Sequence, residues 1–213
     1  MKLAIFGADG RSGVEVVKCA KQAGFDMVAF VYSEVAAKNL GKFFPSGVEV
    51  KKGDIMNYDD VHSALVGVDA VISVVGHIKG SDPLMQTKGI TNIVKVMQSL
   101  GVKRILSLTG TGAREAGDSP SFIDLFLNFF VKLVDPQRIN DGVEHVKVLK
   151  NSGLDWTVVR VLKLGESRGE VGDYKLTDGG PAELLTSRKK VAKVLVDLVN
   201  DRKFIGKCPV VSG

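Results

Sequence analysis

The sequence has little of what cross-links or anchors a protein. It contains two cysteines, Cys19 and Cys208, which lie far apart and have no metal-binding or redox neighbour such as C-x-x-C. We therefore predict two free thiols in a reducing compartment, no metal site and a cytoplasmic location. The longest stretch without a charged residue is nine residues, which is too short to cross a bilayer. These shortages exclude a disulfide scaffold and a membrane-spanning protein.

Linkers and repeats are also missing. The 213 residues are 45% hydrophobic and 25% charged, with no linker rich in Pro, Gly or Ser, which is typical of one globular domain over residues 1–213. The net charge is +5, but lysine and arginine are spread along the chain and form no nucleic-acid arm. A mild positive excess suits an anionic small molecule. We expect a small-molecule substrate, no nucleic-acid or membrane partner, and a monomer or homodimer.

What the sequence does have is alternation of short β-branched runs with longer helical patterns. The predicted strands are Lys2–Phe6, Met27–Tyr32, Val48–Lys51, Ala70–Val75, Arg104–Thr109 and Trp156–Val161. The predicted helices are Ser12–Ala23, Glu34–Phe43, Tyr58–Leu65, Pro83–Leu100, Ile139–Asn151 and Lys189–Asn200. Several strands are apolar at nearly every position, as parallel strands covered by helices on both faces are. The strict order predicts an α/β fold, a Rossmann-type doubly wound parallel sheet, with substrate-side elaborations at about 110–138 and 163–187.

A glycine-rich turn follows the first predicted strand and leads into an amphipathic helix. In a dinucleotide site the first glycine permits the tight turn, the second lets the backbone approach the pyrophosphate, and the third lets the helix pack close to the sheet. The pyrophosphate then lies on N–H groups at the positive end of a helix. An ordinary glycine-rich turn is the alternative. The residues predicted to bind the cofactor here are Gly7, Asp9, Gly10, Arg11, Ser12 and Gly13.

The end of the second predicted strand bears on the choice of cofactor. An NAD site usually has an acid there for the ribose hydroxyls, whereas an NADP site accommodates the 2′-phosphate. This strand ends in Tyr32-Ser33, and its acid, Glu34, comes late. Arg11 and Lys38 are the candidate phosphate ligands, with solvated surface as the alternative for each. We predict NADP (NADPH), with NAD as the alternative, and expect Tyr32, Ser33 and Lys38 to contact it.

Two further strand ends belong to the same edge of the predicted sheet. Asp54 and Ile55 follow the third strand, and Asp54 has two interpretations, contact with the adenine region or capping of the next helix. Val74, Val75 and Gly76 end the fourth strand, and ligands of such sheets lie outside the carboxyl ends of the strands. We therefore predict that these five residues also contact the cofactor.

Together these motifs resemble those of the atypical short-chain dehydrogenase/reductases, the NAD(P)H-binding family that includes flavin reductase/biliverdin-IXβ reductase and the NmrA-like proteins. Besides the glycine turn, the resemblance rests on Val50–Asp54, Asp69–Gly76, Gly101–Ile105, Glu144–Leu149, Ser152–Arg160 and Gly172–Tyr174. It implies an oxidoreductase that transfers hydride to a small conjugated or carbonyl acceptor, such as a flavin, a quinone or a tetrapyrrole. The NmrA-like branch implies the alternative, a non-catalytic regulator that senses the cofactor ratio.

The usual catalytic motif of short-chain dehydrogenases is missing. They use Tyr-x-x-x-Lys on one helix, and none of the three tyrosines here is followed by lysine four residues later. This absence weakens a third interpretation, a sugar-nucleotide epimerase or dehydratase. The resemblance leaves Thr109, Lys147 and Lys163 as candidate catalytic residues, and Thr109 is also expected to hydrogen-bond the cofactor. His77 is a further candidate, whereas we expect His145 to be a structural helix residue.

The most apolar stretch is Phe122–Val134, which contains four of the ten phenylalanines. It follows the segment 110–120, on the substrate side of the predicted fold. Three interpretations stay open: a lid over a planar apolar substrate, an interface between protomers, or core packing of a buried helix.

Overall fold

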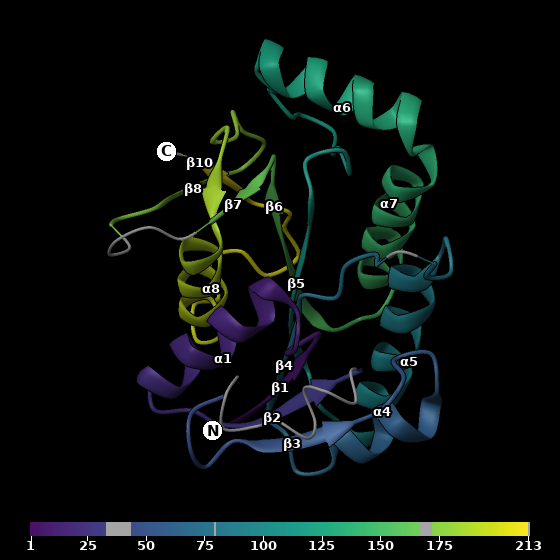
Figure 1. Ribbon diagram of the computed structural model, residues 1–213, viewed down its shortest axis with the longest axis vertical. Coiled ribbons are helices and arrows are strands. Elements are labelled where there is room, and N and C mark those ends of the chain that lie inside the picture. The colour runs from purple at the N-terminus through teal and green to yellow at the C-terminus, as the bar shows by residue number, and fades with distance from the viewer. Residues whose placement is uncertain (33–43, 79, 167–171, 213) are drawn as a thin grey trace.

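The computed structural model describes residues 1–32, 44–78, 80–166 and 172–212. Its main sheet has eight strands in the order β3-β2-β1-β4-β5-β6-β10-β8, as Figure 1 shows. All neighbouring pairs are parallel except β10 and β8. The strands are β1 Lys2–Phe6, β2 Asp26–Val31, β3 Glu49–Lys52, β4 Ala70–Ser73, β5 Arg104–Gly110, β6 Asp155–Val161, β8 Lys175–Thr177 and β10 Val210–Ser212; the separate pair is β7 Leu164–Gly165 with β9 Thr186–Ser187.

The strand order confirms the predicted doubly wound sheet. The chain starts in the middle with β1, adds β2 and β3 on one side, and then returns to place β4, β5 and β6 on the other. β1 therefore pairs with both β2 and β4, so that Leu3 lies between Met27 and Ala70. The strand order reverses between β1 and β4, and in such sheets the crevice outside the carboxyl ends at that point is the usual ligand site.

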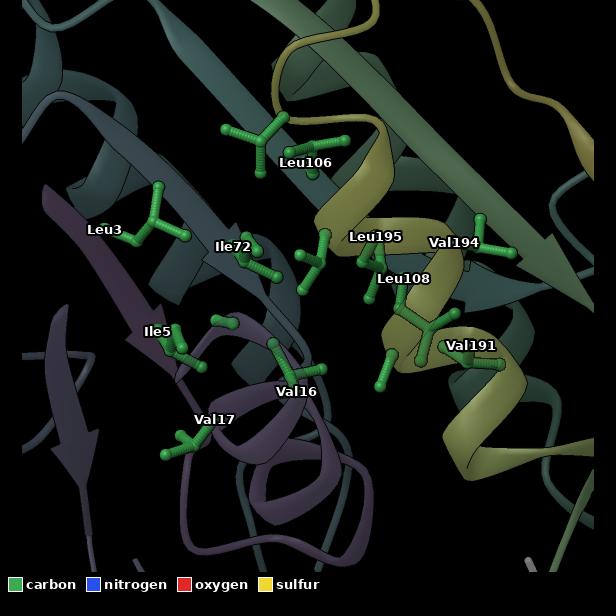
Figure 2. Close-up of a cluster of buried hydrophobic side chains, with 14 of the residues drawn as sticks. Leu3, Ile5, Val16, Val17, Ile72, Leu106, Leu108, Val191, Val194 and Leu195 are labelled. Atoms are coloured by element: carbon green, nitrogen blue, oxygen red, sulfur yellow. The ribbon is translucent and has the colours of Figure 1, made fainter. Parts of the chain in front are cut away.

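Helices cover both faces of the sheet (Figure 1). One face carries α1 Arg11–Gln22 and α8 Arg188–Asp197; the other carries α4 Tyr58–Leu65, α5 Met85–Leu100 and α7 Pro136–Lys150. Successive residues of a strand point to opposite faces, so Leu3 and Ile5 enter one core while Ala4 and Phe6 enter the other. Figure 2 shows the first core, where α1 and α8 meet the sheet through Val16, Val17, Ile72, Leu106, Val191 and Leu195.

The predicted strands and helices agree with the structure to within three residues at each end, wherever the chain is described. Gly101 ends α5 with a φ of +73°, as a C-terminal glycine cap does. The helix predicted over 34–43 lies outside the described residues. The short strands β7 to β10 were not predicted, because two or three residues are too few to show a period.

The helix α6, Phe122–Val134, corrects one interpretation of the apolar stretch. Core packing is wrong: Asp124 is its one buried residue, and nearly all its apolar side chains are exposed. α6 stands apart from the sheet layers and is joined to α7 at one end (Figure 1). The apolar composition of this stretch left three interpretations open, because composition alone does not say which side of an element faces the protein.

Candidate functional site

The glycine turn joins β1 to α1 beside the end of β4. Gly7 has a φ of +77°, which L side chains rarely adopt, and a Cβ there would lie 3.1 Å from the Cα of Val75. At Gly13 a Cβ would lie 2.0 Å from the carbonyl oxygen of Gly7. The first turn of α1 therefore lies directly on the turn that precedes it, and both positions require glycine for reasons of backbone geometry.

Gly10 has a more open environment. It is the N-cap of α1, and its N–H donates to the carbonyl oxygen of Gly7 at 3.0 Å. In the part of the chain that the structure describes, no side chain caps this end of α1, and a Cβ on Gly10 would meet only that oxygen, at 3.2 Å. The helix dipole and the first N–H groups favour an anion here. This cradle fits the pyrophosphate of a dinucleotide, which approaches the backbone closely at the second glycine of such a turn.

The glycine turn also brings an acid to the end of β2. The carboxylate of Asp9 accepts a hydrogen bond from the backbone N–H of Tyr32 at 3.2 Å, and the Tyr32 side chain is exposed. β2 itself lacks the acid that an NAD site usually has at this point, which was the reason for predicting NADP. Asp9 places a carboxylate there from another segment, and sequence spacing gave no signal of this contact.

Of the two predicted phosphate ligands, Arg11 lies in the described part of the chain and Lys38 does not. Arg11 is the first residue of α1, and its side chain is 78% exposed, with its guanidinium 3.6 Å from the Glu166 carboxylate. Lys38, together with Ser33, lies outside the described residues. Of the two predicted phosphate ligands, Arg11 is therefore the one that the structure describes, and it lies next to the cradle at Gly10.

The residues after β3 form a tight turn. The Asp54 carboxylate accepts from the N–H of Met56 at 2.9 Å, and the N-cap of α4 is Asn57. Asp54 thus stabilises the turn before the helix rather than capping the helix itself. Ile55 is nearly buried, and its carbonyl oxygen accepts from Asn92 on α5 at 3.1 Å.

The end of β4 lies against the glycine turn. The N–H of Val74 donates to the carbonyl oxygen of Phe6 at 3.0 Å, and the Val75 carbonyl oxygen accepts from the Gln86 side chain at 2.7 Å. A Cβ on Gly76 would meet no described atom within 4 Å. The backbone of Val75 and Gly76 is therefore held in place and accessible beside the cradle.

A histidine–aspartate pair follows directly. The Nε2 of His77 is 2.8 Å from Oδ2 of Asp141 on α7, and Asp141 is completely buried. The same carboxylate accepts from the N–H groups of Gln86 and Thr87, each at 2.9 Å, and so also caps the start of α5. Nε2 of the His77 ring thus faces the buried carboxylate, and Nδ1 lies 3.5 Å from the Ser81 hydroxyl.

Sequence reasoning missed Asp141, although a signal exists. Asp141, His145 and Leu149 follow one another at intervals of four residues on the buried face of α7. An acid on the apolar face of a helix needs partners, since an unpaired buried carboxylate is costly. That position pointed to a tertiary contact, but the sequence did not say that His77 would provide it.

Thr109 and Ser107 link β5 to the same helix. The Thr109 hydroxyl lies against Gly142, where a Cβ would be 3.0 Å from its oxygen, and Gly142 follows Asp141. One helical turn later, the Nε2 of His145 is 2.8 Å from the Ser107 hydroxyl. Burial lowers the pKa of His145 to about 4, although Asp141 opposes this, so the ring is neutral at pH 7. This environment supports a structural role for His145. The candidate residues that lie at the strand ends are then Thr109, near the end of β5, and His77, after β4.

The two candidate lysines lie in different places. Lys147 is on the exposed side of α7, where its amine pairs with Glu144 at 2.6 Å, away from the buried face that carries Asp141. This placement gives no support to a catalytic role for Lys147. Lys163 follows β6 and is exposed, and its backbone oxygen accepts from the N–H of Thr186 at 2.8 Å. It therefore stands at the carboxyl ends of the strands, one strand away from Thr109.

A hollow of about 400 Å³ lies elsewhere, beside β6 and the end of α7. Its charged side chains pair with one another: Arg160 holds Asp118, and Lys207 holds Asp178. Because these charges are already compensated, we place the candidate site at the strand ends and not in this hollow.

The sequence profile of an NAD(P)H-binding family matches residues 7–202. An isoflavone reductase homolog of Nicotiana tabacum, A622, is 24% identical over 219 aligned positions, covering 97% of this chain and 66% of that protein.

Two solved structures share the fold over the whole chain. A short-chain dehydrogenase/reductase of Veillonella parvula, in complex with NADP, has a TM-score of 0.82 at 17% identity and is covered over 94% of its length. ChuY of Escherichia coli O157:H7, described as an anaerobillin reductase, has a TM-score of 0.79 at 18% identity and is covered over 97%. At these identities the similarity establishes the fold.

Proposed function

This chain belongs to the NAD(P)H-binding family, and from that premise we propose that it is an NADPH-dependent reductase of a small conjugated or carbonyl acceptor. The observation that carries the proposal is the cradle formed by Gly7, Gly10 and Gly13 at the N-terminus of α1, beside the strand-order reversal. NADPH, when bound, supplies a hydride from C4 of its nicotinamide ring. The acceptor class that the resemblance suggests is flavin-, quinone- or tetrapyrrole-like.

The preference for NADPH rests on Arg11. Its exposed guanidinium extends from the first turn of α1 and offers a planar donor set that suits a phosphate. Asp9 acts in the other direction, because a carboxylate at the end of β2 is repelled by a 2′-phosphate. Its bond to the Tyr32 N–H holds it in place. Arg11 and Asp9 therefore set the cofactor preference between them.

The proton that accompanies hydride transfer is assigned to His77. Its protonated ring donates one proton to the acceptor heteroatom, becomes neutral, and regains the proton from water. Asp141 holds Nε2 and so fixes the orientation of the ring. The three tyrosines lie apart from His77 in the sequence and have other surroundings: Tyr32 follows β2 with an exposed side chain, Tyr58 begins α4, and the Tyr174 hydroxyl donates to Asp197. Thr109 positions the reacting groups through its hydroxyl, and Lys163 provides a positive charge for an anionic acceptor.

Cofactor binding is tested by titrating the protein separately with NADPH and NADH and following nicotinamide fluorescence. We expect micromolar or tighter binding and at least about tenfold preference for NADPH, which is about 1.4 kcal/mol. Gly10→Val abolishes binding of both cofactors, Arg11→Ala weakens NADPH much more than NADH, and Asp9→Asn shifts the preference further toward NADPH. Failure of the wild-type chain to bind either cofactor would overturn the proposal.

Turnover is tested with NADPH and a panel of flavins, quinones and a linear tetrapyrrole. We expect His77→Gln to have a lower kcat than the wild type and an unchanged affinity for NADPH, because the change removes the proposed proton donor and leaves the glycine cradle intact. Among the residues that the structure describes, Asp82 and Asp141 are the charged groups that face His77, and both stay in place in this comparison. Lys163→Ala raises KM for an anionic acceptor and leaves cofactor affinity intact. Tight binding without turnover of any acceptor favours the regulator instead.

A further inference from the structure

The helix α6 turns its polar side chains toward the protein. Ser121 caps its N-terminus, and Asp124 is the helix's one buried residue. The Asp124 carboxylate accepts from the hydroxyl of Thr111 and the guanidinium of Arg114, each at 3.1 Å. The Asn128 amide, one turn later, donates to the Thr111 hydroxyl at 3.0 Å. Polar contacts thus fasten α6 to the segment after β5, in the reverse of the usual arrangement of a surface helix.

The opposite side of α6 is apolar and exposed. Around α6, nine apolar residues are between 38% and 84% exposed: Phe122, Ile123, Leu125, Phe126, Phe129, Phe130, Val131, Leu133 and Val134. All but Val131, which is two turns after Asp124 on the same side, lie away from the polar contacts. The four phenylalanine rings contact one another, with centroids 4.7 Å apart between Phe126 and Phe130 and 6.4 Å apart between Phe122 and Phe126. They therefore form one continuous cluster outside the core.

The size of this surface indicates what covers it. At about 200 Å² for a fully exposed phenylalanine, the four rings leave about 500 Å² uncovered, and the five aliphatic side chains add a comparable area. The largest apolar patch of a typical monomer is about 300–600 Å². A standard protein interface takes about 800 Å² from each partner. The exposed face of α6 is therefore about as large as one side of a stable interface.

The spacing of the rings points to a helix as the partner. Phe122, Phe126, Phe129 and Leu133 follow one another at intervals of four, three and four residues, and each is at least half exposed. This is the seam spacing with which two helices pack side by side. The seam carries no charge, so a second copy of the same seam meets it without repulsion.

We propose that α6 is the interface through which two copies of this chain form a dimer, with their α6 helices packed antiparallel about a two-fold axis. In that arrangement the axis passes between Phe126 and Phe129, so Phe126 of each protomer meets Phe129 of the other and Phe122 meets Leu133. The polar contacts of Asp124 and Asn128 remain within each protomer and hold the seam outward.

Two other occupants fit less well. A helix that lies on a membrane surface usually has lysine and arginine on its polar face, whereas α6 presents Asp124 and Asn128 there and has one basic residue, Lys132. Across the described ranges, no helix is long and apolar enough to span a bilayer. An acceptor molecule held beside Thr109 would cover one or two rings and leave the rest of the seam in water.

The experiment is sedimentation velocity with light scattering over a range of protein concentrations, without and with NADPH. We expect the wild type to have twice the chain mass of 22.8 kDa. Phe126→Lys and Phe129→Glu each weaken association about 100-fold or more, because a charge enters the centre of an apolar interface. Mixing the two variants restores a dimer, since Lys at 126 of one chain then faces Glu at 129 of the other.

Controls separate this interface from general effects. Val66→Lys places the same charge at an exposed apolar position at the end of α4 and leaves the dimer intact. Circular dichroism of each variant shows that the monomers are folded. A wild-type chain that stays monomeric at high concentration, or a dimer that survives both charge variants, overturns the proposal. If the monomer instead binds anionic lipid vesicles, or Phe126→Lys raises only the acceptor KM, the proposal is likewise overturned.

Discussion

The helices α1 and α6 are amphipathic and similar in length, with twelve and thirteen residues, but they turn opposite faces to the protein. α1 buries Val16 and Val17 against the sheet and α8, and its polar residues face water. α6 buries Asp124 and exposes its phenylalanines. An apolar stripe therefore shows that a helix has something to cover, but the contacts of its neighbours decide whether the same chain covers it.

The two helices also approach their neighbours differently. α1 lies on bare backbone, because Gly13 faces the carbonyl oxygen of Gly7. α6 approaches Gly112 through side chains: a Cβ at Gly112 would lie 2.9 Å from the Asn128 side-chain oxygen and 3.2 Å from the Ile139 side chain. Side chains can move aside where backbone cannot. A side chain added at Gly13 therefore meets backbone, whereas one added at Gly112 meets side chains.

The largest change in unfolding free energy is expected where a substituted glycine faces backbone, and a smaller one where it faces side chains. Gly13→Ala destabilises the fold by about 4 kcal/mol, because its Cβ overlaps backbone that cannot relax. The matched change near α6, Gly112→Ala, costs less, about 2 kcal/mol, because its Cβ meets side chains, although Asn128 gives up a hydrogen bond to Thr111 when it moves. Urea unfolding of both variants measures the difference. Equal losses of unfolding free energy would mean that the backbone at Gly13 and the side chains at Gly112 yield equally to an added Cβ.

The next effect concerns the segment that leads into α6. Arg160 and Asp118 are both buried and form a two-bond ion pair, with distances of 2.5 and 2.8 Å. Asp118→Ala leaves the Arg160 charge buried and unpaired and costs about 3 kcal/mol. Asp178→Ala, which removes the exposed pair with Lys207 in the same hollow, costs less than about 1 kcal/mol. Unfolding free energies at pH 7 test this contrast.

The same ion pair predicts a pH dependence. Burial pushes the pKa of Asp118 upward, but hydrogen bonds from Arg160 and from the Glu115 N–H outweigh it and hold the pKa below its usual value. In the unfolded chain that pKa is about 3.9. The contribution of Asp118 is therefore complete above about pH 4 and is lost as the pH falls through the lower, folded value. The stability gap between the wild type and Asp118→Ala should narrow in acid; a constant gap would contradict this.

The smallest changes in stability are expected from truncating one apolar side chain in each helix, Val17 in α1 and Phe129 in α6. In the monomeric Phe126→Lys background, Val17→Ala costs about 2 kcal/mol, because it opens a gap between α1 and the sheet. Phe129→Ala in the same background changes stability by less than about 0.5 kcal/mol, since its ring is exposed. Thermal or urea unfolding measures both. A loss of 2 kcal/mol at Phe129 would mean that the ring packs within its own chain.

The glycine turn of the candidate site could be predicted because it follows the chain locally. Gly7, Gly10 and Gly13 lie within one turn between a strand and a helix, and local spacing places them there. The contact of Asp9 with Tyr32 and the pairing of His77 with Asp141 join residues 23 and 64 positions apart. No local period relates such residues, so the sequence predicts no acid at the end of β2. Lys147 is a candidate through the family resemblance, and its position on the outer side of α7 offers no support for that role.

The sequence by itself determined the order of strands and helices, the doubly wound sheet and the glycine cradle, because backbone geometry and hydrophobic period act over a few residues. Only the tertiary structure decided which acid reaches the end of β2, which carboxylate orients His77, and which face of α6 meets water. These outcomes depend on how crossovers bring distant strand ends together. The physical reason is that burial and ion pairing are properties of neighbours in space, and the fold chooses those neighbours.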